Sequence, residues 1–155
     1  MNYKDKIANV EGVPVKTGSN FPFRILLADD DAQLLEVHGD VLTLFGYHVD
    51  TASNGVEAWN SLHETDYDLL ITDNNMPRLT GMDLIKKVRS AGISMPIILA
   101  SGTVPLDELK QNSKLTIDSI LVKPFYLDEL LATVKKVLGF GDRENQSMTC
   151  LYGRG

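Results

Sequence analysis

The sequence has almost no cysteine: Cys150 is the only one in 155 residues. A single cysteine forms no disulfide within the chain, which excludes a disulfide-stabilised fold and agrees with a reducing compartment. Long apolar runs are also missing, since no stretch approaches the roughly 18 residues that cross a bilayer. The first ten residues mix charged and apolar side chains, unlike a signal peptide. We therefore expect a cytoplasmic protein with no membrane partner.

Dense positive charge is absent as well. The chain has 15 Lys and Arg against 21 Asp and Glu, which gives a formal net charge of -6. No cluster of basic residues is dense enough to attract a phosphate backbone, so we expect no nucleic-acid binding. At this length, and with 43% hydrophobic residues, one globular domain with a single core is favoured.

Short apolar runs and amphipathic helices alternate along most of the chain. Strands are predicted at 24–28, 47–52, 68–72, 96–100 and 119–122, and the first and third of these segments are apolar runs typical of buried strands. The first helix is capped by Asp31 and ended by Gly46, and its helical spacing places Leu34, Val37, Val41, Leu44 and Phe45 on one side. Further helices are predicted after Asn54-Gly55 and over 81–91, 106–110 and 127–138. Such strict alternation predicts an α/β fold with a parallel sheet covered by helices on both faces.

Polar residues whose side chains could bind a ligand or react follow directly after the predicted strands. The first strand ends in Asp29, Asp30 and Asp31, the third in Asp73, the fourth in Ser101 and the fifth in Lys123. Ligands of open parallel sheets bind beyond the carboxyl ends of the strands, so these groups are expected to converge. Clustered carboxylates repel one another unless a cation lies between them, and Mg2+ prefers such oxygen ligands. A carboxylate beside Mg2+ can attack phosphorus, with the lysine and the hydroxyl stabilising the phosphoryl oxygens.

Four segments resemble the signature blocks of response-regulator receiver domains. They are Ile25-Leu26-Leu27-Ala28-Asp29-Asp30-Asp31, Asp68-Leu69-Leu70-Ile71-Thr72-Asp73-Asn74-Asn75-Met76-Pro77, Pro96-Ile97-Ile98-Leu99-Ala100-Ser101-Gly102 and Leu121-Val122-Lys123-Pro124-Phe125. The resemblance covers about residues 23 to 140 and implies a flavodoxin-like, doubly wound, five-stranded parallel sheet of order 2-1-3-4-5 with five helices. It implies a signalling switch rather than an enzyme, phosphorylated by a histidine kinase or a histidine phosphotransfer protein and acting on an unknown downstream protein target.

The resemblance also implies a role for each matching residue. Asp73 matches the phosphoacceptor, Ser101 the switch hydroxyl and Lys123 the lysine that contacts the phosphoryl group. The expected Mg2+ ligands are Asp30, Asp73 and the backbone carbonyl of Asn75, with Asp29 acting through water. The bond from Lys123 to Pro124 is commonly cis in this family.

Three positions depart from the family pattern. Ile120 stands where an aromatic residue is frequent, Thr80 replaces a frequent acid, and Gly102 stands where alanine is common. None of them removes a group from the predicted site, but Ile120 argues against an output that depends on an aromatic rotamer.

Each site residue also has a simpler structural interpretation. Asp31 alone is better explained as a helix cap than as a ligand, and Asp73 could form only a turn. Ser101 could be a helix cap, and Lys123 a solvated surface lysine. The three histidines lack metal-ligand spacing, and His38 has a position from which it can face the core.

Other functions fit the same fold. A pseudo-receiver would keep the fold as an interaction scaffold without phosphorylation. An aspartyl-phosphate phosphatase usually has a second acid two residues after its nucleophile, where this chain has Asn75. A flavodoxin-like nucleotide binder would need a phosphate loop after the first strand, which is missing. Residues 1–22 are interpreted as an N-terminal extension and 141–155 as a flexible tail, which leaves open a single-domain regulator or a receiver from a larger hybrid protein.

Overall fold

The structure is a computed structural model that describes residues 22–139. Its sheet has five strands: β1 (Arg24–Ala28), β2 (His48–Ala52), β3 (Leu69–Asp73), β4 (Ile97–Ser101) and β5 (Ser119–Val122). All four strand pairs are parallel, in the order β2-β1-β3-β4-β5. The predicted strand order is therefore confirmed. The proposed extension before residue 22 and the proposed C-terminal tail lie outside the described residues.

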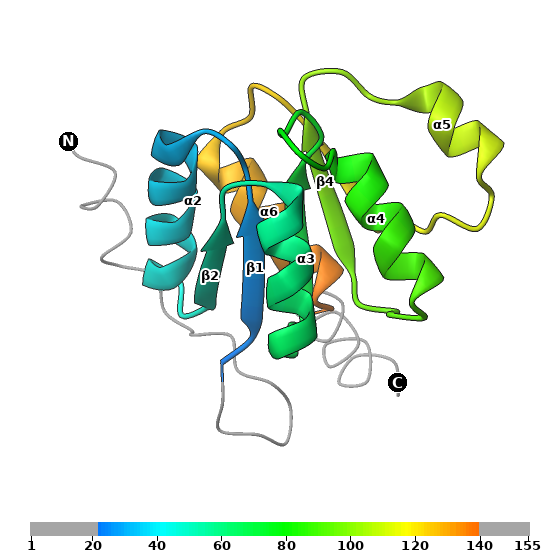
Figure 1. Cartoon of the computed structure of the whole chain (residues 1–155). Helices are drawn as coiled ribbons and strands as arrows, with labels where there is room; N and C mark the ends of the chain where they lie inside the picture. Colours follow the sequence, from blue (N-terminus) through cyan, green and yellow to red (C-terminus); the bar gives the residue numbers. More distant parts are fainter. Residues whose placement is uncertain (1–21, 140–155) are drawn as a thin grey trace, which may run out of the picture.

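Five helices cover the two faces of the sheet. They are α2 (Ala32–Leu44), α3 (Gly55–Glu64), α4 (Gly81–Ser90), α5 (Leu106–Gln111) and α6 (Leu127–Val137). Figure 1 shows α2 and α6 on one face and α3 and α4, with α5 beyond them, on the other. Within the described residues, no helix is long and apolar enough to cross a membrane.

Alternation along each strand divides the core into two layers. In β1, Ile25 and Leu27 pack towards α2 and α6, whereas Leu26 and Ala28 pack towards α3 and α4. Successive side chains of a strand point to opposite faces, and both faces of this sheet are covered. This is why β1, β3 and β4 appear in the sequence as nearly continuous apolar runs. The edge strand β2 is more polar and mostly exposed or half-buried.

Two aspartates fix the strand register at the opposite edge from the predicted site. The Asp68 carboxylate accepts the Arg24 backbone N–H at 2.7 Å, and the Asp68 N–H donates to the Arg24 carbonyl at 2.8 Å. Asp118 repeats this arrangement with Ile97, at 2.8 Å and 2.9 Å. Each aspartate satisfies a backbone N–H that the parallel ladder leaves unpaired at the start of a strand.

The buried side of α2 differs from the predicted one. Asp31 caps the helix as expected, accepting from the N–H groups of residues 33 and 34. Val37 and Leu44, however, are 36% and 51% exposed, whereas His38 and Leu42 are buried. The buried face of the helix is rotated towards these two residues because the helix lies over β1 and β2. The spacing of apolar residues alone therefore predicted the wrong middle of this face.

The C-terminal end of α4 is held by several hydrogen bonds to neighbouring segments, whereas α5 is held weakly. The Arg89 guanidinium donates to the backbone carbonyls of residues 93, 95 and 116 at 2.8–3.1 Å. These bonds join the end of α4 to the segments that precede β4 and β5. In contrast, α5 has no buried residue, and Lys86 on α4 reaches its Glu108 at 3.1 Å through an exposed ion pair.

Replacing Gly39 by alanine is expected to stabilise the protein. Gly39 lies inside α2, and an added Cβ would meet Thr51 and Val49 at 3.9 and 4.0 Å, which is ordinary contact. Removing a glycine from a helix interior is worth about 0.5–1 kcal/mol. Denaturant unfolding measures the change, and Gly81→Ala is the opposite control, since its Cβ would lie 2.1 Å from the Asp73 carbonyl oxygen. A destabilised Gly39→Ala protein would contradict the packing described for α2.

Candidate functional site

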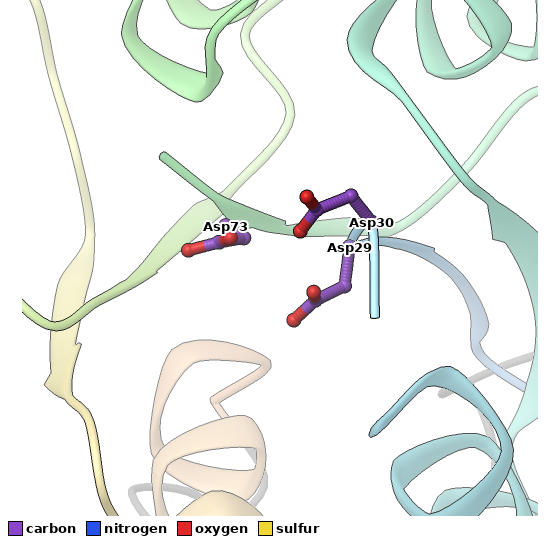
Figure 2. A group of neighbouring side chains, drawn as sticks. All are labelled: Asp29, Asp30 and Asp73. Atoms are coloured by element: carbon purple, nitrogen blue, oxygen red, sulfur yellow. The ribbon is translucent and has the colours of Figure 1, made fainter. Parts of the chain in front are cut away.

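Three carboxylates meet at the carboxyl ends of β1 and β3. Asp29 and Asp73 are 5% and 6% exposed, whereas Asp30 is open to solvent. One carboxylate oxygen from each of the three lies within 4.8 Å of the others. Figure 2 shows the three side chains at the ends of their neighbouring strands. The convergence expected from the sequence is therefore observed.

Lys123 reaches this cluster from the end of β5. Its Nζ donates to Asp29 Oδ2 at 2.9 Å and lies 3.5 Å from Asp73 Oδ1. Burial disfavours the ammonium, but the hydrogen bond and charge of Asp29, with a contribution from Asp73, hold the pKa of Lys123 above its ordinary value. The Lys123–Pro124 bond is cis, as expected. Lys123 is thus an internal counter-ion and not a solvated lysine.

Asp73 is harder to ionise than an ordinary aspartate. Burial raises its pKa most, and the charge of Asp29 adds to this effect. The Lys123 ammonium and the backbone N–H groups of Asn74 and Asn75 act in the opposite direction without reversing it. The Lys123 ammonium therefore offsets the cost of burying the Asp73 carboxylate only in part.

The loop after β3 is held close to Asp73. The Asn74 carbonyl accepts the N–H of Gly81 at 3.0 Å, and its side chain accepts the N–H of Met82 at 3.0 Å. A Cβ at Gly81 would overlap the Asp73 carbonyl, so glycine is required where α4 begins. Sequence reasoning assigned no role to Asn74 or Gly81. A polar side chain before a Met-Pro turn and a glycine at the next helix start were the available signals.

Ser101 lies buried at the end of β4, one strand from Asp73. Its Oγ donates to the Thr103 carbonyl at 2.7 Å and accepts the Thr103 N–H at 3.3 Å. The cap of α5 is Pro105, without a side-chain bond, so the interpretation of Ser101 as a helix cap is wrong. The hydroxyl instead closes the first turn of the loop that leads to α5.

The other predicted positions lie around this cluster. Asn75 is exposed in the loop after β3. Ile120 packs, half-buried, against the core layer of α3 and α4. The structure therefore brings Asp29, Asp30, Asp73 and Lys123 together, with Ser101 and Asn75 on adjoining segments.

Asp73→Asn is expected to stabilise the folded protein when divalent cations are absent. A carboxyl with a raised folded-state pKa favours its protonated form, so wild-type stability should fall as pH rises through that pKa. An amide carries no charge to desolvate, and the advantage of the variant should grow from acidic to neutral pH. Denaturant unfolding at several pH values with a chelator measures this, and the exposed Asp66→Asn is the control. A variant less stable than wild type at neutral pH would contradict the assignment.

Comparisons with known proteins agree with this geometry. The family model for the response regulator receiver domain matches residues 25–135. The probable transcriptional regulatory protein SilR of Salmonella typhimurium is 36% identical over 119 residues, covering 77% of this chain and 52% of that protein. The transcriptional regulatory protein CusR of Escherichia coli K12 is 35% identical over 118 residues, covering 76% and 52%. The chain spans about half the length of these curated relatives.

Solved structures give the same result. The chemotaxis response regulator CheY4 of Vibrio cholerae matches with a TM-score of 0.68 and 30% identity, covering 75% of this chain and 98% of that one. The response regulator TrrA of Thermotoga maritima, solved in complex with Mg(2+)-BeF, matches with a TM-score of 0.66 and 33% identity, covering 74% and 98%. With the family model matched across the sheet and its acidic site, this chain belongs to the response-regulator receiver domain family.

Proposed function

We propose that this chain accepts a phosphoryl group on Asp73 and controls a partner through the resulting change of shape. The observation that carries the proposal is a buried Asp73 carboxylate with two carboxylates within 4.8 Å and the Lys123 ammonium at 3.5 Å. Receiver domains are signalling domains and not enzymes in the usual sense. Self-phosphorylation from a small phosphodonor, and slow loss of the group, are the only reactions expected.

The residues present fit Mg2+, which takes oxygen ligands and keeps several waters. Both oxygens of Asp29 are engaged, one by Lys123 and one by the Asp31 N–H at 2.9 Å. Within residues 22–139, neither the Asp30 carboxylate nor the Asn75 carbonyl has a hydrogen-bond partner. This difference supports Asp30, Asp73 and the Asn75 carbonyl as direct ligands, with Asp29 acting through water. When bound, Mg2+ would supply positive charge to the phosphoryl oxygens.

The chemistry asked of the chain is a single displacement at phosphorus. An Asp73 carboxylate oxygen forms the new P–O bond while the bond from phosphorus to the donor breaks, and the donor leaves with the electron pair. Lys123 stays charged and moves its donors from Asp73 towards the incoming phosphoryl oxygens. Ser101 donates its hydroxyl to the same group.

A phosphohistidine on a histidine kinase or a phosphotransfer protein is the expected phosphodonor. The half-length match to longer transcriptional regulators leaves the downstream protein target unassigned. No basic cluster favours nucleic acid as a partner of the described residues. The proposal includes a cytoplasmic location, for which the single cysteine is the supporting observation. A pseudo-receiver scaffold is the alternative, and it would have the same fold without phosphorylation.

Acetyl phosphate with Mg2+ should add one phosphoryl group to the wild-type protein, and peptide mapping should find it on Asp73. Asp73→Asn should lose this label because the amide is not a nucleophile, whereas Asp66→Asn should keep it. Intact-mass spectrometry with and without a chelator measures the gain. Absence of the label in a folded wild-type protein would favour the scaffold, and equal labelling of Asp73→Asn at the same site would refute the assignment.

The loop after Ser101 is the element that phosphorylation would move. To donate to a phosphoryl oxygen, the Ser101 hydroxyl must leave the Thr103 carbonyl to which it now donates. That loss would loosen the turn over 102–105, and α5 follows with no fully buried residue, held to the core by the half-buried Leu109. Ile120 has no ring with which to fill space behind the hydroxyl, so we expect a backbone shift and not a rotamer change.

Ser101→Ala should still accept the phosphoryl mimic beryllofluoride but lose most of the amide shift changes over 102–111. Ile120→Ala should alter those shifts only modestly, since its side chain packs in the core layer and carries no polar group. NMR spectra of both variants, with and without beryllofluoride, measure this. A response of wild-type size in Ser101→Ala would exclude the mechanism.

A further inference from the structure

A pocket lies beside the proposed phosphoacceptor site, between α2 and the segment that links β5 to α6. It has a volume of about 290 Å³ and is lined by Leu34, His38, Lys123, Pro124 and Phe125. Its walls are almost entirely apolar, because the charged end of Lys123 is held by Asp29. Lys123 is the one lining residue that the pocket shares with the acidic cluster.

His38 is the one imidazole in this pocket, and it has no hydrogen-bond partner in the described part of the chain. The residue is 8% exposed, and its ring stacks on Phe125 with a centroid distance of 5.3 Å and an interplanar angle of 27°. Among the described residues, the Tyr47 hydroxyl is the only side-chain polar atom that is both sealed and unpaired. The His38 nitrogens are therefore unpaired but still accessible.

The electrostatics of the pocket favour a neutral ligand. Burial lowers the pKa of His38, against the smaller opposing effect of Asp29, so the ring is uncharged at neutral pH. A neutral imidazole offers one donor and one acceptor. Lys123 disfavours a cationic ligand, and the Asp29 carboxylate that pairs with Lys123 removes most of its attraction for an anion.

We propose that this pocket binds a small neutral heteroaromatic molecule, with one N–H group donating to His38 and the ring packed against Phe125, Leu34 and Pro124. The volume lies at the lower limit for small-molecule sites, which suits a single ring or two fused rings. A ligand that fills the pocket removes water from the His38 nitrogens, and leaving them unpaired is then costly, so a ligand that pairs with His38 gains over one that only fills the space. The occupant would touch the stem of Lys123 and could influence the phosphoacceptor site.

Indole and indene are a matched pair of probes, because they have the same two-ring shape and only indole has an N–H group. NMR titration of the wild-type protein, without Mg2+ or phosphodonor, should shift signals of Leu34 and Phe125 with both. Indole should bind about tenfold more tightly than indene, the worth of one hydrogen bond. Because no phosphoryl chemistry is involved, this result is independent of the proposed function.

His38→Phe should remove the preference for indole while keeping a ring against Phe125, and His63→Phe on the distant α3 should keep it. Should His38→Phe fail to fold, the two probes on the wild-type protein still decide. Equal affinity for indole and indene, or no shift at the pocket with either, would overturn the proposal. Binding of N-acetyl-tryptophanamide as tight as that of indole would also overturn the proposal. The pocket would then accept the side chain of a partner protein and not only a small free molecule.

Discussion

One ammonium shared between two buried carboxylates sets the charge balance at the functional edge of this protein. Asp29 and Asp73 are both nearly inaccessible, and Lys123 lies 2.9 Å from an oxygen of the first and 3.5 Å from an oxygen of the second. With Asp30 added, negative charge exceeds positive charge there, while burial is the main cause of the raised pKa of Asp73 and the charge of Asp29 adds to it. Under the proposed function, a cation bound at this cluster would offset the excess negative charge and support chemistry at phosphorus.

The rest of the fold limits which segments could move if Asp73 gained a new charge. The strand ends are fixed by paired ladders, and Arg89 ties the end of α4 to the segments before β4 and β5. Between these anchors, within the described residues, the Ser101 hydroxyl is bonded only to Thr103, and α5 contacts the core through the half-buried Leu109 without a fully buried residue. Under the proposed function, an exchange of hydrogen bonds at Ser101 would act on this weakly held segment and leave the core layers on both faces of the sheet packed.

The sequence predicted the parts of this structure that depend on local pattern. The alternation of five predicted strands with five helices was sufficient for a parallel sheet, and polar residues after the strands indicated the functional edge. The rule for parallel strand ends also predicted that Asp29 and Lys123, 94 positions apart, would converge. It did not specify which carboxylate oxygen would accept the hydrogen bond of Lys123. The rotation of α2 that buries His38 and exposes Val37 depends on how the helix lies over β1 and β2, which periodicity does not specify. The need for glycine at position 81 depends on the path of the loop back to Asp73.

The most direct test of this account is the free energy of unfolding as a function of Mg2+ concentration. A cation that completes the acidic cluster binds only the folded protein, so it should stabilise the wild type by about 2.7 kcal/mol at a hundredfold excess over its dissociation constant. Asp30→Ala should lose most of this gain, because Asp30 is the carboxylate whose oxygens no other group occupies. If Mg2+ leaves the free energy of unfolding of the wild type unchanged, or stabilises Asp30→Ala equally, the cluster of Asp29, Asp30 and Asp73 is not a metal site.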